Sequence, residues 1–290
     1  MTVASPAQTL SPARRREHII DALIAERAPK LAASPVWPLL RPLLYSFLDY
    51  GKARRLADAI APLSGKAALD YVSRLLAVQV AVRGLEHLPA SGRLVVVCNH
   101  PTGIADGVAV YDALKAVRPD ICFYANSDAH RVSQRFGEVL IPVEWREEKR
   151  TRERTRQTLI LTREALEAGR CLVIFPAGRL ARRQADGRLA DLPWAPSAVS
   201  LARKYEAPIV PINLKGPWSG MFHFFNAFSS ELRDITLFHE LLNKQGRAFS
   251  LTVGAPIAPE ALDGDPGELT LRLKAYVENE LPTDPAPDFK

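Results

Sequence analysis

From residue 79 onwards, short apolar runs alternate with stretches of helical periodicity, and this alternation limits the possible folds more than any other feature. The runs LVVV at 94–97 and CLVIF at 171–175 are apolar at every position. Such runs are typical of strands that are buried on both faces of a sheet. Because the strands alternate with helices, the sequence predicts an α/β domain with a mixed, mostly parallel sheet covered by helices on both faces.

The same patterns give approximate bounds for the elements of this domain. Strands are expected at 79–83, 94–99, 121–125, 139–143, 172–175, 209–214 and 249–253. Helices are expected at 106–116, 151–168, 195–205 and 269–279. Open α/β sheets bind their ligands in the loops that follow the carboxyl ends of the strands. Functional residues are therefore expected in those loops.

Three regions are expected along the chain. Residues 1–78 form an N-terminal helical module, in which prolines separate the helices. Residues 79–258 form the α/β domain. Residues 259–290 form an acidic C-terminal helix and tail.

The stretch Trp37–Tyr50 is amphipathic and is followed by the cations Lys52, Arg54 and Arg55. A helix of this kind suits the headgroup region of a membrane, with its apolar side down and its cations near phosphates. It is equally typical of a helix that packs on the main domain. The sequence leaves both interpretations open, and they are compatible with each other.

Charge is distributed unevenly along the chain. The net charge is +6, and residues 1–200 carry 29 basic against 20 acidic side chains, while residues 201–290 carry 9 against 12. A basic body indicates an anionic partner, such as lipid headgroups, an acidic carrier protein, a phosphorylated substrate or nucleic acid. Nucleic acid is the weakest of these because aromatic residues are not interleaved with the basic clusters. We therefore expect no nucleic-acid partner.

Targeting signals and metal sites are also not expected. No apolar segment approaches the roughly 20 residues of a spanning helix, and no apolar stretch precedes the N-terminal arginines as in a secretory signal. Any membrane contact is therefore expected to be peripheral. The three cysteines lie in apolar runs and are interpreted as buried thiols in a reducing compartment. The histidines have no paired ligand spacing, so no metal site is expected.

The segment RLVVVCNHPTGIADGVAVYDAL at 93–114 carries the clearest chemical pattern. A buried strand ends at Asn99 and His100, a turn with Gly103 follows, and Asp106 begins a helix. A carboxylate that holds the Nδ1 proton of a histidine leaves Nε2 free to accept a proton from a hydroxyl group. The alternatives are that Asp106 only caps the helix and that His100 is an ordinary polar residue.

A second strand runs into a Pro-Ala-Gly turn at 176–178, and the cations Arg179, Arg182 and Arg183 follow it. Guanidinium groups bind phosphate or carboxylate in a bidentate manner. The cluster therefore indicates an anion site, with a solvated basic loop as the alternative.

These segments resemble the glycerolipid acyltransferase family, which includes lysophosphatidic acid acyltransferases. NHPTGIAD at 99–106 is similar to the family's catalytic block, and FGEVLIPV at 136–143 stands in the place of its second block. VIFPAGR at 173–179 is similar to the block that binds the acceptor, and APIVPINLKG at 207–216 to the fourth block. ELLNKQGRAFSLTVGAPI at 240–257 resembles a stretch of the haemolysin-like branch, which includes acyltransferases of lyso-ornithine lipid.

The resemblance implies transfer of a fatty acyl group from acyl-carrier protein or acyl-CoA to the hydroxyl of a lysophospholipid or lyso-amino-acid lipid, with no other cofactor. It implies that His100 is the general base and Asp106 its partner. The substrate-binding residues that it implies, together with the neighbouring basic residues, are Asn99, Thr102, Gly103, Phe175, Pro176, Gly178, Arg179, Arg182 and Arg183. It also implies a protein on the cytoplasmic side, peripheral on an anionic inner membrane face, with acyl-carrier protein as a potential partner.

Two departures from the family pattern motivate an alternative function. Ala177 stands where the third block has an acidic residue, and five residues rather than four separate His100 from Asp106. The haemolysin-like branch shares the longer spacing. The alternative is a lipid- or carrier-binding protein on the same scaffold without turnover. The basic stretch 145–158 and the phenylalanine-rich stretch 221–228 fit either ordinary packing and solvation or contacts with a carrier protein, an acyl chain or a membrane.

Overall fold

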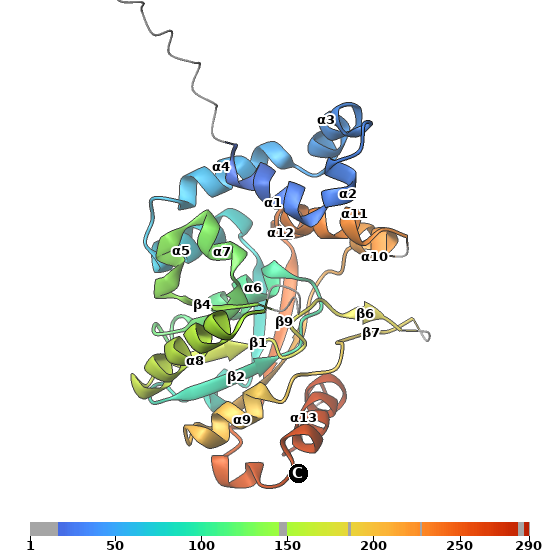
Figure 1. Ribbon diagram of the computed structural model, residues 1–290. Helices are drawn as coiled ribbons and strands as arrows, with labels where there is room; N and C mark the ends of the chain where they lie inside the picture. Colours follow the sequence, from blue (N-terminus) through green and yellow to red (C-terminus); the bar gives the residue numbers. More distant parts are fainter. Residues whose placement is uncertain (1–16, 145–149, 185–186, 227, 284–286, 290) are drawn as a thin grey trace, which may run out of the picture.

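A computed structural model describes residues 17–144, 150–184, 187–226, 228–283 and 287–289 (Figure 1). Its centre is a seven-stranded sheet in the order β1-β9-β8-β2-β5-β3-β4. The strands are β1 (Gln79–Arg83), β2 (Leu94–Cys98), β3 (Cys122–Asn126), β4 (Leu140–Val143), β5 (Cys171–Ile174), β8 (Ile209–Lys215) and β9 (Ala248–Val253). Each of them lies within two residues of an expected strand, so these predictions are confirmed.

The sheet is mixed and mostly parallel, as predicted. The strands β8, β2, β5, β3 and β4 run in one direction, whereas β9 is antiparallel to β8 and parallel to β1. The carboxyl ends of β2, β5 and β8 consequently meet at one edge, and β9 begins at that same edge. The connection 216–247 between β8 and β9 therefore lies at the edge where the strand-end loops gather (Figure 1).

Helices cover both faces of the sheet, which confirms the predicted α/β class. On one face, Leu94 and Val96 pack with α5 (Gly65–Leu76), α6 (Ile104–Leu114) and α12 (Leu237–Leu242). On the other face, Val95 and Val97 pack with three further helices. These are α8 (Arg152–Glu167), α9 (Ser197–Lys204) and α13 (Pro266–Ala275), and α13 continues into a π-helical turn at Tyr276–Glu280. All four strand residues are inaccessible to solvent, as their apolar pattern predicted.

Helices precede the sheet along the N-terminal part of the chain. They are α1 (Ile19–Arg27), α2 (Pro29–Ala32), α3 (Trp37–Phe47) and α4 (Tyr50–Ile60), followed by α5. Ile20 and Ala57 form an apolar cluster with Ile235 of α11 (Ser230–Ile235), so these helices pack on the connection 216–247.

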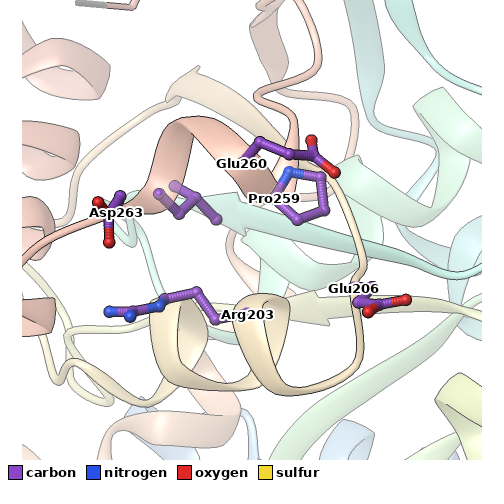
Figure 2. Close-up of a pocket in the computed structure, with 6 residues that line it drawn as sticks. Arg203, Glu206, Pro259, Glu260 and Asp263 are labelled. Carbon is purple, nitrogen blue, oxygen red and sulfur yellow. The ribbon is translucent and has the colours of Figure 1, made fainter.

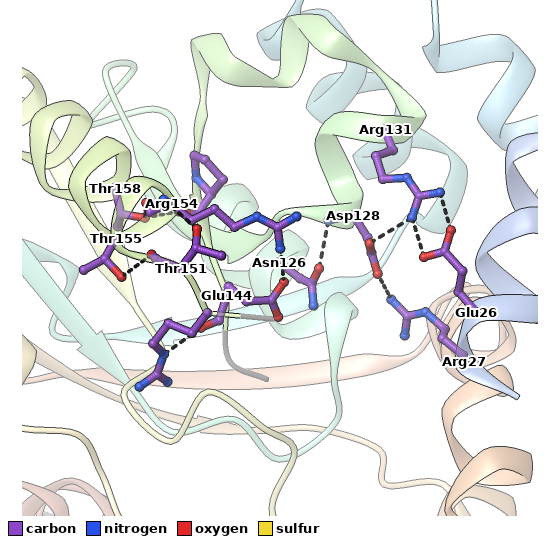
Figure 3. A network of polar contacts seen from close by, with 12 residues as sticks. Glu26, Arg27, Asn126, Asp128, Arg131, Glu144, Thr151, Arg154, Thr155 and Thr158 are labelled. Atoms are coloured by element: carbon purple, nitrogen blue, oxygen red, sulfur yellow. Dashed lines mark hydrogen bonds and ion pairs between the residues drawn. The ribbon is translucent and has the colours of Figure 1, made fainter. Parts of the chain in front are cut away.

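Ion pairs add a second attachment between the N-terminal helices and the sheet region (Figure 3). Arg27 lies 2.9 Å from Asp128 and Glu26 lies 2.7 Å from Arg131, on α7 (Asp128–Val132). Farther along the chain, Arg154 of α8 lies 3.1 Å from Glu144, just after β4.

Helix α3 packs on the N-terminal helices with one side, as one of the two interpretations of Trp37–Tyr50 expects, and the other interpretation stays a prediction. Trp37, Leu44 and Tyr45 pack on the N-terminal apolar cluster. Its other side exposes large apolar side chains. They are Leu39 (76% exposed), Leu40 (37%), Leu43 (68%) and Phe47 (61%). Within the described residues, no helix is long and apolar enough to cross a membrane.

Some elements differ from the sequence expectations. Helix α6 begins at Ile104 rather than Asp106, because Gly103 takes the N-cap position. The antiparallel pair β6 (Arg182–Arg183) and β7 (Leu189–Ala190) was not predicted, since two-residue strands leave no periodic signal. Helices α7, α10 (Gly220–Asn226) and α11 were also not predicted. Of the basic stretch 145–158, residues 145–149 lie outside the described residues.

The phenylalanine-rich stretch around α10 is divided between the interior and the surface. Phe222 is buried, whereas Phe224 and Phe228 are 62% and 60% exposed. The three cysteines are free, buried thiols. Burial raises the pKa of Cys122 to about 11 and of Cys171 to about 12, so these thiols stay protonated and pack as small apolar groups.

Candidate active site

His100 and Asp106 lie together at the central strand edge. The loop after β2 carries His100, and Asp106 occupies the first turn of α6. Nδ1 of His100 is 2.9 Å from Oδ2 of Asp106, and the two side chains are 16% and 0% exposed. A buried carboxylate at Nδ1 fixes the proton on that nitrogen and leaves Nε2 as the proton acceptor.

Asp106 contacts His100 and also stabilises the start of α6, as the N3 acid of a capping interaction with Gly103 at the N-cap. The backbone N–H groups of Thr102 and Gly103 donate to its Oδ2 at 2.9 and 3.0 Å, and the Thr102 hydroxyl donates to Oδ1. Gly103 has φ 107° and ψ −146°, a conformation that is essentially restricted to glycine. A Cβ atom there would lie 3.1 Å from Leu180. Gly103 thus allows the turn that brings Asp106 back to His100.

The Pro-Ala-Gly turn lies against the same histidine. The Phe175 ring stacks on the His100 imidazole with centroids 4.5 Å apart. The Gly178 N–H closes the turn by donating to the Phe175 carbonyl at 2.9 Å, with Gly178 at φ 62°. The Ala181 N–H donates to the His100 carbonyl at 2.9 Å. The turn with Pro176 at its corner therefore forms one wall of the site.

Asn99 contacts the neighbouring strand. Its amide Nδ2 donates to the Leu214 carbonyl at 2.9 Å, and its Oδ1 accepts from the Leu214 N–H at 2.7 Å. Both ends of the amide are therefore used to join the ends of β2 and β8. In this arrangement Asn99 orients the loop that carries His100.

The three predicted arginines differ in their surroundings. Arg179 and Arg183 are exposed, whereas Arg182 is half-buried with its guanidinium carbon 5.3 Å from the centre of the Phe222 ring. Burial lowers the pKa of Arg182, and the nearby cations Arg233 and Arg179 lower it further. Several positive charges thus gather beside the Pro-Ala-Gly turn, an arrangement that favours an anionic ligand.

The sequence of this region matches a known protein family. Residues 79–215, which hold the parallel strands and the His100–Asp106 pair, match the family model described as Acyltransferase. This match supports the resemblance of residues 79–215 to the glycerolipid acyltransferase family.

Curated relatives and one solved structure are similar to this chain. A lyso-glycine lipid O-acyltransferase of Phocaeicola vulgatus is 27% identical over 202 residues, which cover 67% of this chain and 70% of the relative. One of Bacteroides thetaiotaomicron is 23% identical over 201 residues, covering 67% and 72%. The crystal structure of the lysophosphatidic acid acyltransferase PlsC from Thermotoga maritima is 17% identical with a TM-score of 0.48, covering 87% of this chain and 98% of that chain.

The candidate site contains a buried carboxylate that sequence reasoning missed. Asp191 is 5% exposed, and its two oxygens lie 3.1 and 3.2 Å from the backbone nitrogen of His100. It also accepts a hydrogen bond from Trp194 Nε1 at 2.8 Å. The only sequence signal was a single acid within the apolar-flanked run LADLPW, and that signal is weak.

A buried ion pair near Asp106 was also missed. Lys244 and Glu240 are 2% and 1% exposed and lie 3.3 Å apart, and the Ser219 hydroxyl donates to Glu240 at 2.7 Å. Burial lowers the pKa of Lys244, while the negative charges of Glu240 and Asp106 raise it. The spacing of four residues resembles an ordinary surface pair of a helix, so the sequence gave no sign of its burial.

A separate pocket lies away from this site, at the end of α9 and the start of the C-terminal segment (Figure 2). Its volume is about 310 Å³, and it is lined by Arg203, Glu206, Pro259, Glu260, Leu262 and Asp263. Ile209 begins β8 and is bridged to Ile257, so this pocket is at the amino-terminal edge of β8. His100 is at the opposite edge of the sheet.

Proposed function

We propose that this protein transfers a fatty acyl group from an acyl thioester to the hydroxyl of a lyso-amino-acid lipid or a lysophospholipid. The observation that carries the proposal is the 2.9 Å contact between His100 Nδ1 and the buried Asp106 carboxylate. The match to the Acyltransferase family model supports the reaction type. The alternative of a binding protein without turnover was motivated by Ala177 and the longer spacing, but that spacing still brings His100 and Asp106 into contact.

In the proposed reaction, Nε2 of His100 accepts the proton of the lipid hydroxyl while the oxygen attacks the thioester carbonyl. The tetrahedral intermediate collapses with cleavage of the carbon–sulfur bond. The thiolate leaves and receives the proton from the imidazolium, so the products are an ester and a thiol. Asp106 keeps the Nδ1 proton in place and favours the imidazolium that forms between the two steps. The thioester is a co-substrate, and this reaction requires no metal or other cofactor.

The acceptor headgroup is proposed to bind at Arg179, Arg182 and Arg183. A guanidinium group binds a carboxylate or a phosphate with paired hydrogen bonds. The relatives are named for lyso-glycine lipid, whose headgroup is an amino acid. That name favours a carboxylate-bearing acceptor over a glycerol phosphate, and it agrees with the missing acid at Ala177. Phe175, Pro176 and Gly178 would shape the wall against which the headgroup lies.

We also propose that the protein acts at the cytoplasmic face of an anionic membrane. The exposed apolar side of α3 is the contact surface, with Leu39, Leu43 and Phe47 entering the headgroup region. Lys52, Arg54 and Arg55 follow on α4 and would attract anionic lipids. Phe224 on α10 adds another exposed apolar side chain. An acidic acyl-carrier protein is a potential donor, for which the exposed arginines of α8 offer a basic surface.

Lipid analysis of cells that lack the protein tests this function. We expect a lyso-lipid to accumulate, and its headgroup identifies the acceptor. The purified protein should then acylate that lyso-lipid with acyl-carrier protein or CoA as donor. Binding of the lyso-lipid with no loss of thioester from either donor would favour the binding protein without turnover.

A further inference from the structure

Asp191 stands out as a buried charged group that the proposed reaction does not yet use. It lies between β7 and α9, and its carboxylate accepts from two donors, the His100 backbone N–H and Trp194 Nε1. Its own N–H donates to the Glu278 carboxylate at 2.7 Å. A second carboxylate therefore holds His100, by accepting from its backbone N–H and not from its side chain.

A buried carboxylate is energetically unfavourable at this position if its only role is structural. Any neutral acceptor can satisfy a backbone N–H, whereas burying a carboxylate requires compensation of its charge. Burial raises the pKa of Asp191 to about 6, and the hydrogen bonds from Trp194 and His100 oppose this shift. Both neighbours are donors and both reach Oδ2, so the neutral acid can still accept from them through one carbonyl oxygen. The ionised form accepts from them more strongly, because hydrogen bonds to a charged acceptor are stronger than those to a neutral one.

We propose that ionised Asp191 is a positioning residue for His100, which fixes the main chain of the proposed base and favours the imidazolium formed during acyl transfer. The inference rests on the proposed function. In this proposal a second carboxylate assists the reaction by acting on His100, and it does not contact the substrate. Loss of its charge should therefore slow the chemical step and leave acceptor binding unchanged.

The groups that face Asp191 come from several elements. His100 faces it from the loop after β2, and Cys98 interacts with it electrostatically from the end of β2 itself. Burial raises the pKa of the Cys98 thiol well above its usual range, so this group stays neutral. Glu278 faces it from the π-helical turn and is paired with Lys274 of α13. Among these groups, His100 is therefore the one that the Asp191 carboxylate contacts directly.

The pH dependence of kcat separates this role from a purely structural one. If both Asp191 and His100 must be deprotonated, the slope of log kcat against pH in the acid limb approaches two. In Asp191→Asn the slope should approach one, and kcat at neutral pH should fall by about 10- to 100-fold with the KM of the acceptor unchanged. Asp263→Asn, an exposed carboxylate at the opposite edge of the sheet, is the matched control and should keep the wild-type profile.

Trp194→Phe provides a second variant in case Asp191→Asn does not fold. Phenylalanine keeps an aromatic ring in place and removes the N–H that stabilises the ionised carboxylate. The pKa of Asp191 should rise above about 6, so the acid limb should move to higher pH. A merely structural contact would lower activity by the same factor at every pH.

An NMR titration of the His100 backbone amide distinguishes failure of this inference from failure of the proposed function. In the wild-type protein without substrates, this amide, which donates to Asp191, should show an inflection near pH 6, which Asp191→Asn should remove. An active enzyme without that inflection, or with the same slope in both proteins, overturns the role of Asp191. If the inflection is present but the protein transfers no acyl group, the proposed function is wrong, while the interaction between Asp191 and His100 stands.

Discussion

Nδ1 of His100 lies 2.9 Å from Oδ2 of Asp106, and Asp106 is completely excluded from solvent. Three other donors, from Thr102 and Gly103, also point at this carboxylate. The carboxylate therefore has the partners that a buried charge needs, and it holds the imidazole in one orientation.

Asp106→Asn should lower kcat by about two to four orders of magnitude. At the Oδ2 position the amide oxygen can still accept from Nδ1 of His100 and from the two backbone N–H groups, with its NH2 group facing the Thr102 hydroxyl. The variant loses the negative charge that favours the imidazolium formed during acyl transfer. Steady-state kinetics with a circular dichroism spectrum of the variant checks this. A folded variant with activity within about threefold of the wild type would contradict the role of Asp106.

Gly103→Ala should destabilise the protein by about 1–3 kcal/mol because alanine strongly disfavours this backbone conformation. The added Cβ would also lie 3.1 Å from the Leu180 side chain. Gly107→Ala is the matched control, because Gly107 lies within α6 and a Cβ there meets nothing within 4 Å. That control should be stabilising by about 0.5–1 kcal/mol. Urea unfolding measures both, and equal stability of the two variants would refute the argument.

Arg182→Ala should raise the KM of the acceptor by about tenfold or more, because a charge-assisted hydrogen bond to an anionic headgroup contributes about 1.5–3 kcal/mol. The kcat should change much less. Arg135→Ala removes an exposed arginine in an ordinary surface pair with Glu138 and is the control. If acceptor KM is the same in the wild type and Arg182→Ala, this arginine does not bind the headgroup.

Replacing Leu39 and Leu43 by serine should weaken binding to anionic vesicles by at least about 100-fold. Each leucine is largely exposed, and burial of one such side chain contributes about 1.5–3 kcal/mol. The thermal stability should change little because neither side chain is in the core. Leu271→Ser, at a site on α13 with 64% exposure, is the control. Undiminished vesicle sedimentation of the double variant would exclude α3 as the contact surface.

Much of the fold was predictable from the sequence. The runs LVVV and CLVIF have no polar face, which fixes them as central strands, and the structure pairs β2 with β5 and β8. The contact between His100 and Asp106 was also predicted, because Gly103 lies between them in a strand-end turn. The sequence did not reveal that Asp106 would serve as helix cap and histidine partner at the same time.

The missed parts of the site depend on long-range packing. Asp191 is 91 residues from His100 along the chain, and no local pattern connects a side-chain acceptor to a distant backbone N–H. Glu240 and Lys244 have the spacing of a surface pair, yet both are buried in the region where α12 packs against α4 and α6. Helices α10 and α11 are too short to show a clear period. They lie over the strand ends because β9 is antiparallel to β8, so the connection between these two strands stays at that edge of the sheet.

The most direct test of the account is the single-turnover rate of acyl transfer by His100→Ala with the identified lyso-lipid and its acyl thioester. A single turnover isolates the chemical step from binding and product release. If His100 is the base, the rate constant falls by about two to four orders of magnitude while the variant still binds the lyso-lipid. A folded variant that transfers the acyl group at the wild-type rate would show that His100 is not the base.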